Sequence, residues 1–100
     1  MKNQGIPEYD EKRNTLTELN KQVGWVKAHF GEKEADKMKE YPNRLKSKWK
    51  EYRKKYKMAS DPDEQERLGG TFKTEMRTIA REAEKAYKEY KERAATRRRK

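Results

Sequence analysis

The chain has 100 residues, of which 30% are hydrophobic and 46% charged, so it provides material for one small domain with a modest core. It contains no cysteine, which excludes disulfides, thiolate nucleophiles and cysteine metal ligands. No apolar run suits a signal peptide or a membrane-spanning helix, and we expect a protein of the cytoplasm or of a virion that is neither secreted nor membrane-bound.

The formal net charge of +10 is distributed in blocks along the chain. Residues 1–42 carry eight bases and eight acids, and residues 43–58 carry eight bases and one acid. Residues 59–76 carry two bases and five acids, and residues 77–100 carry ten bases and four acids. Two basic blocks therefore flank an acidic one, and the near-absence of compensating acid in residues 43–58 indicates an anionic partner.

The first predicted helix begins near Thr15. Residues 1–13 show no apolar stripe, and we expect a flexible N-terminal arm there. Thr15 and Glu18 fit a capping box, which predicts the helix start. Apolar residues then recur at helical spacing, at Leu16, Leu19, Val23, Val26 and Phe30. Gly31 is the predicted end of this helix.

The second major helix is both apolar and strongly basic. Pro42 predicts a kink or short break, because proline disfavours helical geometry at Tyr41. After it, large apolar residues recur at spacings of four, three and four, at Leu45, Trp49, Tyr52 and Tyr56. We expect these side chains to form core, which is a stronger interpretation than base stacking by exposed rings.

The last helix has a strong start signal in Asp61 and Pro62, an N-cap side chain followed by proline at the first helical position. Its apolar stripe runs through Leu68, Phe72, Met76, Ile79, Ala83, Tyr87 and Tyr90. Gly69 and Gly70 lie inside the stripe, so a weakened helix or hinge and a complete break are both open. Residues 97–100 carry no apolar side chain and predict a disordered basic tail.

Together these elements predict an all-α fold: a small three-helix domain built on an antiparallel helical hairpin, spanning residues 14–96. The hairpin consists of the second and third major helices, joined by a few residues near Ser60. An extended N-terminal arm, residues 1–13, and a basic C-terminal tail, residues 97–100, flank this domain.

Catalytic and metal-binding patterns do not emerge from the sequence. His29 is the single histidine, and no serine or acid recurs around it as a triad would require. Residues 69–74 lack the spacing of a phosphate loop, and no strand precedes them. We therefore expect no enzyme activity, no cofactor and no metal.

The basic blocks predict a small nucleic-acid-binding protein, DNA-binding or RNA-binding, that contacts mainly the phosphate backbone with low sequence specificity. The predicted contact residues are Arg44, Lys46, Lys48, Lys50, Arg53, Lys54, Lys55, Lys57, Arg97, Arg98, Arg99 and Lys100. The sequence leaves open whether the nucleic acid is single- or double-stranded.

Trp25 and the apolar face of the basic helix bear on other kinds of partner. Trp25 lies one residue off its stripe, beside His29, and these two are a candidate interface for a protein partner or for self-association. Burial of Trp25 under the N-terminal arm is the stronger interpretation. A membrane partner is not expected, because the apolar face is rich in tyrosine and is needed for the core.

The alternative function is that of a structural or assembly subunit of a larger particle, a virion or ribonucleoprotein. Its basic face would then dock on acidic protein or on packaged nucleic acid. The small core and the charge-balanced first 42 residues suit a protein completed by its neighbours.

Overall fold

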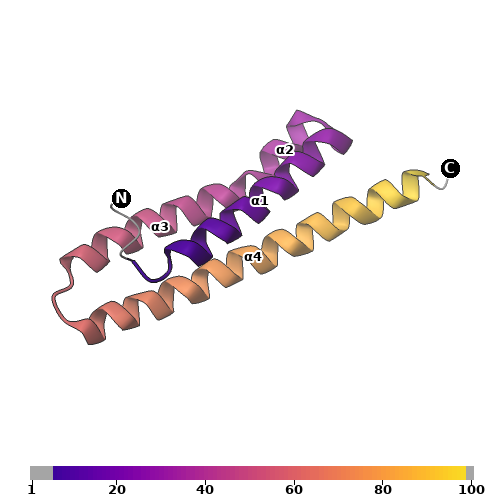
Figure 1. Cartoon of the computed structure of the whole chain (residues 1–100). Helices are drawn as coiled ribbons and strands as arrows, with labels where there is room; N and C mark the ends of the chain where they lie inside the picture. Colours follow the sequence, from indigo (N-terminus) through magenta and orange to yellow (C-terminus); the bar gives the residue numbers. More distant parts are fainter. Residues whose placement is uncertain (1–5, 99–100) are drawn as a thin grey trace.

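The computed structural model describes residues 6–98, with side chains through Thr96. This part of the chain contains α-helices and no strand: α1 (Tyr9–Phe30), α2 (Glu32–Met38), α3 (Glu40–Met58) and α4 (Pro62–Arg98). The predicted all-α fold is confirmed. α1 runs along the bundle, α2 and α3 return beside it, and α4 runs back along both (Figure 1).

Contacts between α3 and α4 show that these helices run antiparallel. The guanidinium of Arg44 reaches Glu82, and the ammonium of Lys48 reaches Glu75. Near the connection, the side-chain amide of Gln65 donates hydrogen bonds to the backbone oxygens of Tyr56 and Ala59. Residue numbers rise on one helix as they fall on the other. The molecule is elongated, with extents of 60 × 22 × 17 Å.

The beginning of α1 corrects the predicted arm of residues 1–13. α1 begins at Tyr9, and Ile6 and Glu8 are only 5% and 6% exposed. The backbone N–H of Tyr9 donates to the oxygen of Ile6, and the Tyr52 hydroxyl donates to the Glu8 carboxylate. The long-range contact from Tyr52 and the burial of Ile6 hold residues 6–8 against the bundle. The arm prediction is therefore wrong for residues 6–13, and residues 1–5 lie outside the described part.

The predicted helix start at Thr15 is also wrong. Thr15 lies in the interior of α1, where its backbone N–H has an intrahelical partner and needs no cap. The end of α1 is as predicted, since Gly31 terminates it with φ of 90°, a conformation that glycine adopts without strain.

The interruption before α3 lies earlier than Pro42. It falls at Lys39, between the end of α2 and the start of α3 at Glu40. Pro42 occupies the first turn of α3, where a missing N–H leaves no hydrogen bond unmade, and its ring is buried. The break predicted at Tyr41 is therefore displaced by two residues.

α4 begins as the sequence predicts and extends further than predicted. The backbone N–H of Asp63 donates to the Asp61 carboxylate over 3.1 Å, an N-cap contact ahead of Pro62. α4 passes through Gly69 and Gly70 without a break. It continues through Arg98, so the disordered tail is wrong for the backbone of residues 97 and 98, while residues 99 and 100 lie outside the described part.

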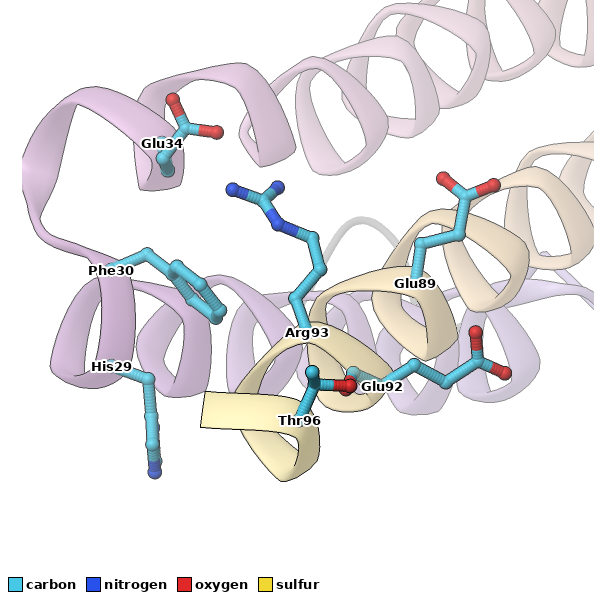
Figure 2. Close-up of a pocket in the computed structure, with 7 residues that line it drawn as sticks. All are labelled: His29, Phe30, Glu34, Glu89, Glu92, Arg93 and Thr96. Carbon is cyan, nitrogen blue, oxygen red and sulfur yellow. The ribbon is translucent and has the colours of Figure 1, made fainter. Parts of the chain in front are cut away.

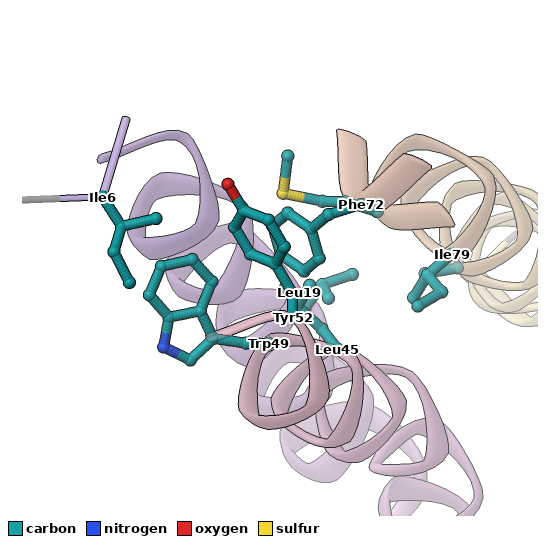
Figure 3. Close-up of a cluster of buried hydrophobic side chains, with 9 residues drawn as sticks. Ile6, Leu19, Leu45, Trp49, Tyr52, Phe72 and Ile79 are labelled. Carbon is teal, nitrogen blue, oxygen red and sulfur yellow. The ribbon is translucent and has the colours of Figure 1, made fainter. Parts of the chain in front are cut away.

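The core confirms the packing predicted for α3. Trp49 is 6% exposed, and the rings of Tyr52 and Phe72 stack at 4.9 Å with 8° between their planes (Figure 3). A second buried cluster lies toward the α2 end and consists of Val23, Val26, Ala35 and Met38. Aromatic rings of α4 pack against this second cluster.

Gly69 provides a notch for a buried carboxylate. A Cβ atom at this position would lie 3.0 Å from both carboxylate oxygens of Glu8. A Cβ atom at Gly70 would meet nothing within 4 Å. Close packing against Glu8 therefore explains the absence of a side chain at Gly69 and does not explain it at Gly70.

We predict opposite effects of alanine at these two positions. Gly70→Ala should raise the free energy of unfolding by about 0.5–1 kcal/mol, because alanine loses less backbone entropy in a helix. Gly69→Ala should lower it, because the added methyl group displaces the Glu8 carboxylate from its site. Urea denaturation followed by circular dichroism measures both.

Removing the carboxylate provides the control. In a Glu8→Ala background, Gly69→Ala should become stabilising, as Gly70→Ala is, because the clash is gone. A stabilising Gly69→Ala in the wild-type background would contradict the notch.

Candidate functional site

One edge of α3 faces α4 and has its cations paired with acids. The Arg44 guanidinium lies 2.9 Å from the Glu82 carboxylate, and the Lys48 ammonium lies 2.8 Å from that of Glu75. The hydrogen bond with Arg44 lowers the pKa of Glu82 and raises that of Arg44. Three of the predicted contact residues, Arg44, Lys48 and Lys55, are thus already engaged by carboxylates, the last by Glu51 at 3.2 Å.

The other edge and the outer face of α3 carry cations of a different kind. Among residues 6–96, four exposed lysines of α3 form no ion pair; we name them the α3 strip: Lys46, Lys50, Lys54 and Lys57. Their spacing of four, four and three places them along one side of the helix, over a length of about 16 Å. Arg53, half-buried, lies beside the strip toward α1. The structure thus divides the predicted α3 residues into a paired edge and an exposed row.

Lys12 of α1 lies beside the cationic side of α3, although we predicted it to belong to the flexible N-terminal arm. Its ammonium lies 4.9 Å from the ring centroids of both Tyr9 and Trp49. Partial burial, followed by the nearby positive charge of Arg53, lowers the pKa of Lys12. A signal for it existed, because Tyr9 and Lys12 continue the spacing of the α1 stripe back from Leu16.

A buried polar contact fixes the N-terminal segment beneath this surface. The Tyr52 hydroxyl donates to Glu8, and the Lys73 ammonium lies 3.9 Å from the same carboxylate. Burial, then the hydrogen bond to Glu8, raises the pKa of the Tyr52 hydroxyl, which keeps it protonated and able to donate. The arrangement is structural, since Glu8 is only 6% exposed.

The predicted partner residues Trp25 and His29 lie near the opposite end of the bundle. Trp25 packs edge-on against Tyr87 at 5.5 Å and stacks on the His29 ring at 3.9 Å. Trp25 is therefore half-buried, and its ring joins α1 to α4. His29 is exposed, and its Nδ1 donates to the backbone oxygen of Trp25 over 2.9 Å. Their role in binding a partner remains a prediction.

An open cleft of about 940 Å³ lies beside His29 (Figure 2). The guanidinium of Arg93 lies 5.0 Å from the centroid of Phe30 and 5.2 Å from that of Tyr90, and so covers both rings. The Tyr90 hydroxyl donates to Glu34 over 3.1 Å, and hydrogen bonds from Lys37 and Tyr90 lower the pKa of this carboxyl. These contacts join α4 to α1 and α2 across the cleft.

Residues 6–98 show neither a metal-binding cluster nor a membrane-spanning helix. This part of the chain contains no group of three or more histidine, aspartate or glutamate side chains that could hold a metal ion. None of its helices has an apolar stretch long enough to cross a bilayer.

The two edges of α3 should respond differently to neutralisation. Arg44→Gln should lower the urea midpoint at low ionic strength, because it leaves Glu82 without its partner on α4. Lys46→Gln should leave the midpoint unchanged, since this lysine forms no ion pair in the described part. Urea midpoints measured at about 0.02 and 0.5 M salt check this prediction, and equal effects of the two substitutions at the lower salt concentration would contradict the division.

The chain was compared with protein-family models, curated proteins and solved structures, and none of them matches it.

Proposed function

We propose that this protein binds nucleic acid mainly through the phosphate backbone, with the α3 strip as the central contact. The observation that carries the proposal is the division of charge on α3. The cations of one edge form ion pairs with carboxylates. The lysines of the α3 strip are exposed and form no ion pair among residues 6–96: Lys46, Lys50, Lys54 and Lys57.

The arrangement of the strip suits a polymer of regularly spaced negative charges. Four ammonium groups follow one another along a straight helix at axial intervals of about 4.5–6 Å. A single acid, Glu51, lies within their span, and it is occupied by Lys55. Each phosphate that such a row neutralises releases condensed counterions, which provides affinity without reading sequence.

The chemistry of the strip supports low sequence specificity. Lysine presents a compact charge on a flexible stem and so suits a phosphate, whereas arginine, asparagine and glutamine are better matched to the paired groups of a base edge. Phosphate contacts fix position and contribute no direct sequence information.

The remaining predicted residues would contribute at the periphery. Arg44, Lys48 and Lys55 would have to exchange a carboxylate for a phosphate, so their gain is smaller than that of the strip. Arg97 and Arg98 are the last two residues of α4, and Arg99 and Lys100 come next in the sequence; these four residues would add contacts away from α3.

Neutralising three strip residues together tests the proposal. Lys46→Gln, Lys50→Gln and Lys57→Gln combined should weaken binding to random-sequence DNA and RNA. They should also reduce the log–log salt slope of the association constant by about 2.7, corresponding to three phosphate contacts. Fluorescence anisotropy over a salt series measures both, and circular dichroism should show unchanged helicity.

The matched control is a triple substitution of exposed cations on α4, Arg81→Gln, Lys85→Gln and Lys88→Gln, which removes the same formal charge. These side chains alternate with acids along α4, and we expect a smaller change in slope. Equal losses in the two triple variants would assign the binding to net charge alone. Absent binding by the wild type, with concentration-dependent oligomers in sedimentation, would favour the assembly role.

A further inference from the structure

A cavity between α1 and α4 contains a buried acceptor without a donor. The two helices lie side by side (Figure 1), and a cavity of about 360 Å³ opens between them. Gln22 of α1 lines this cavity and is 5% exposed. Its Nε2 donates to the Glu84 carboxylate over 3.3 Å, whereas its Oε1 accepts from no group of residues 6–96. A buried carbonyl oxygen without a donor costs free energy, which indicates that a donor comes from outside the chain.

Two carboxylates from different helices line the same cavity. They belong to Glu18 of α1 and Glu84 of α4. Both residues are exposed, and neither forms an ion pair within the part of the chain whose side chains are described. This holds although Lys21, Arg81 and Lys88 lie within one helical turn of them in sequence. A cation that enters the cavity would therefore be attracted by two carboxylates that have no other cationic partner there.

The cavity also has apolar walls. Leu19, which is 2% exposed, and Ala80 line it together with the polar groups. Such walls suit an alkyl stem, in the way that the stem of a lysine packs on apolar surface while its charge stays at a polar edge. An ammonium group has three N–H donors, which match two carboxylates and the free Oε1. A guanidinium is planar and is better matched to a single carboxylate through two parallel bonds.

We propose that this cavity is a binding site for a primary ammonium group on an alkyl stem, the end of a polyamine or the side chain of a lysine from another chain. The ammonium donates to Glu18 and Glu84, and a small rotation of the Gln22 amide brings Oε1 to its third N–H. The terminal torsion of glutamine is soft, and the present bond from Nε2 is longer than usual, so this rotation costs little. The site lies away from the α3 strip and does not depend on nucleic-acid binding.

Three simple ligands separate the features of the proposed group. Pentylamine has the ammonium and the stem, 1-pentanol has the stem without charge, and tetramethylammonium has the charge without N–H donors. Pentylamine should shift the side-chain amide NMR signals of Gln22 saturably at about 0.02 M salt, where screening is weak. The other two ligands should shift them much less. The signals are identified by their absence in Gln22→Met.

Substitution of the carboxylates tests the proposed contacts. Glu18→Gln and Glu84→Gln should each weaken pentylamine binding about tenfold or more, because each removes a hydrogen bond to a charged acceptor. The matched control is Glu92→Gln, which neutralises an exposed glutamate of α4 outside the cavity and should leave the affinity nearly unchanged.

Gln22→Met separates a contact role from a structural one. Methionine has similar length and removes the unpartnered acceptor, so the urea midpoint should rise. Pentylamine binding, followed through the backbone amide signals of α1, should weaken about three- to tenfold, the value of one hydrogen bond. A glutamine with only a structural role would give a lower midpoint and unchanged binding, and this result would contradict the proposal.

Spermidine and Nα-acetyl-lysine methylamide distinguish the two sources of the ammonium, and the one that binds more tightly identifies the source. The absence of a saturable shift with any of the amines would overturn the site, and a water molecule would then be the donor to Oε1. Equal responses to pentylamine and tetramethylammonium, or unchanged binding in both Glu18→Gln and Glu84→Gln, would assign the effect to charge alone and would overturn it as well.

Discussion

One buried contact fixes which side of α3 faces the core: the packing of Trp49 and Tyr52 against Phe72 of α4. Tyr52 and Phe72 stack face to face, and Trp49 lies 5.4 Å from the same phenylalanine ring. Burying rings of this size contributes several times more free energy than any exposed ion pair in the molecule. Once these rings face inward, every other side chain of α3 has its direction assigned.

The division of the basic block, residues 43–58, follows from that orientation of α3. Arg44 and Lys48 emerge on the side where α4 lies, and the acids of α4 meet them there. The α3 strip emerges on the outer side and toward α1, where no carboxylate of the described chain reaches it. A block that reads as uniformly basic along the sequence thus becomes two surfaces, one that joins helices and one that is exposed to solvent.

The N-terminal segment has a part in the same surface. Glu8 enters a notch that Gly69 leaves open and accepts the hydroxyl of Tyr52, which holds the first turn of α1 against α3. That docking brings Lys12 over Trp49 and close to Arg53. The buried carboxylate of Glu8 therefore helps to position the ammonium of Lys12.

Local patterns in the sequence were sufficient for the helices and for the side of each that is buried. The stripe through Leu45, Trp49 and Tyr52 predicts the inward face of α3, and Asp61 predicts the start of α4, because spacing and capping act within one or two turns. Only tertiary contacts decided that α1 begins at Tyr9, since a single buried hydrogen bond from Tyr52 stabilises a turn whose sequence reads as polar. Tertiary contacts also decided which cations of α3 are paired with acids, and they placed Lys12 of α1 over Trp49 of α3. Electrostatic partners are set by distance in space, and a helical repeat in the sequence carries no information about the neighbouring helix.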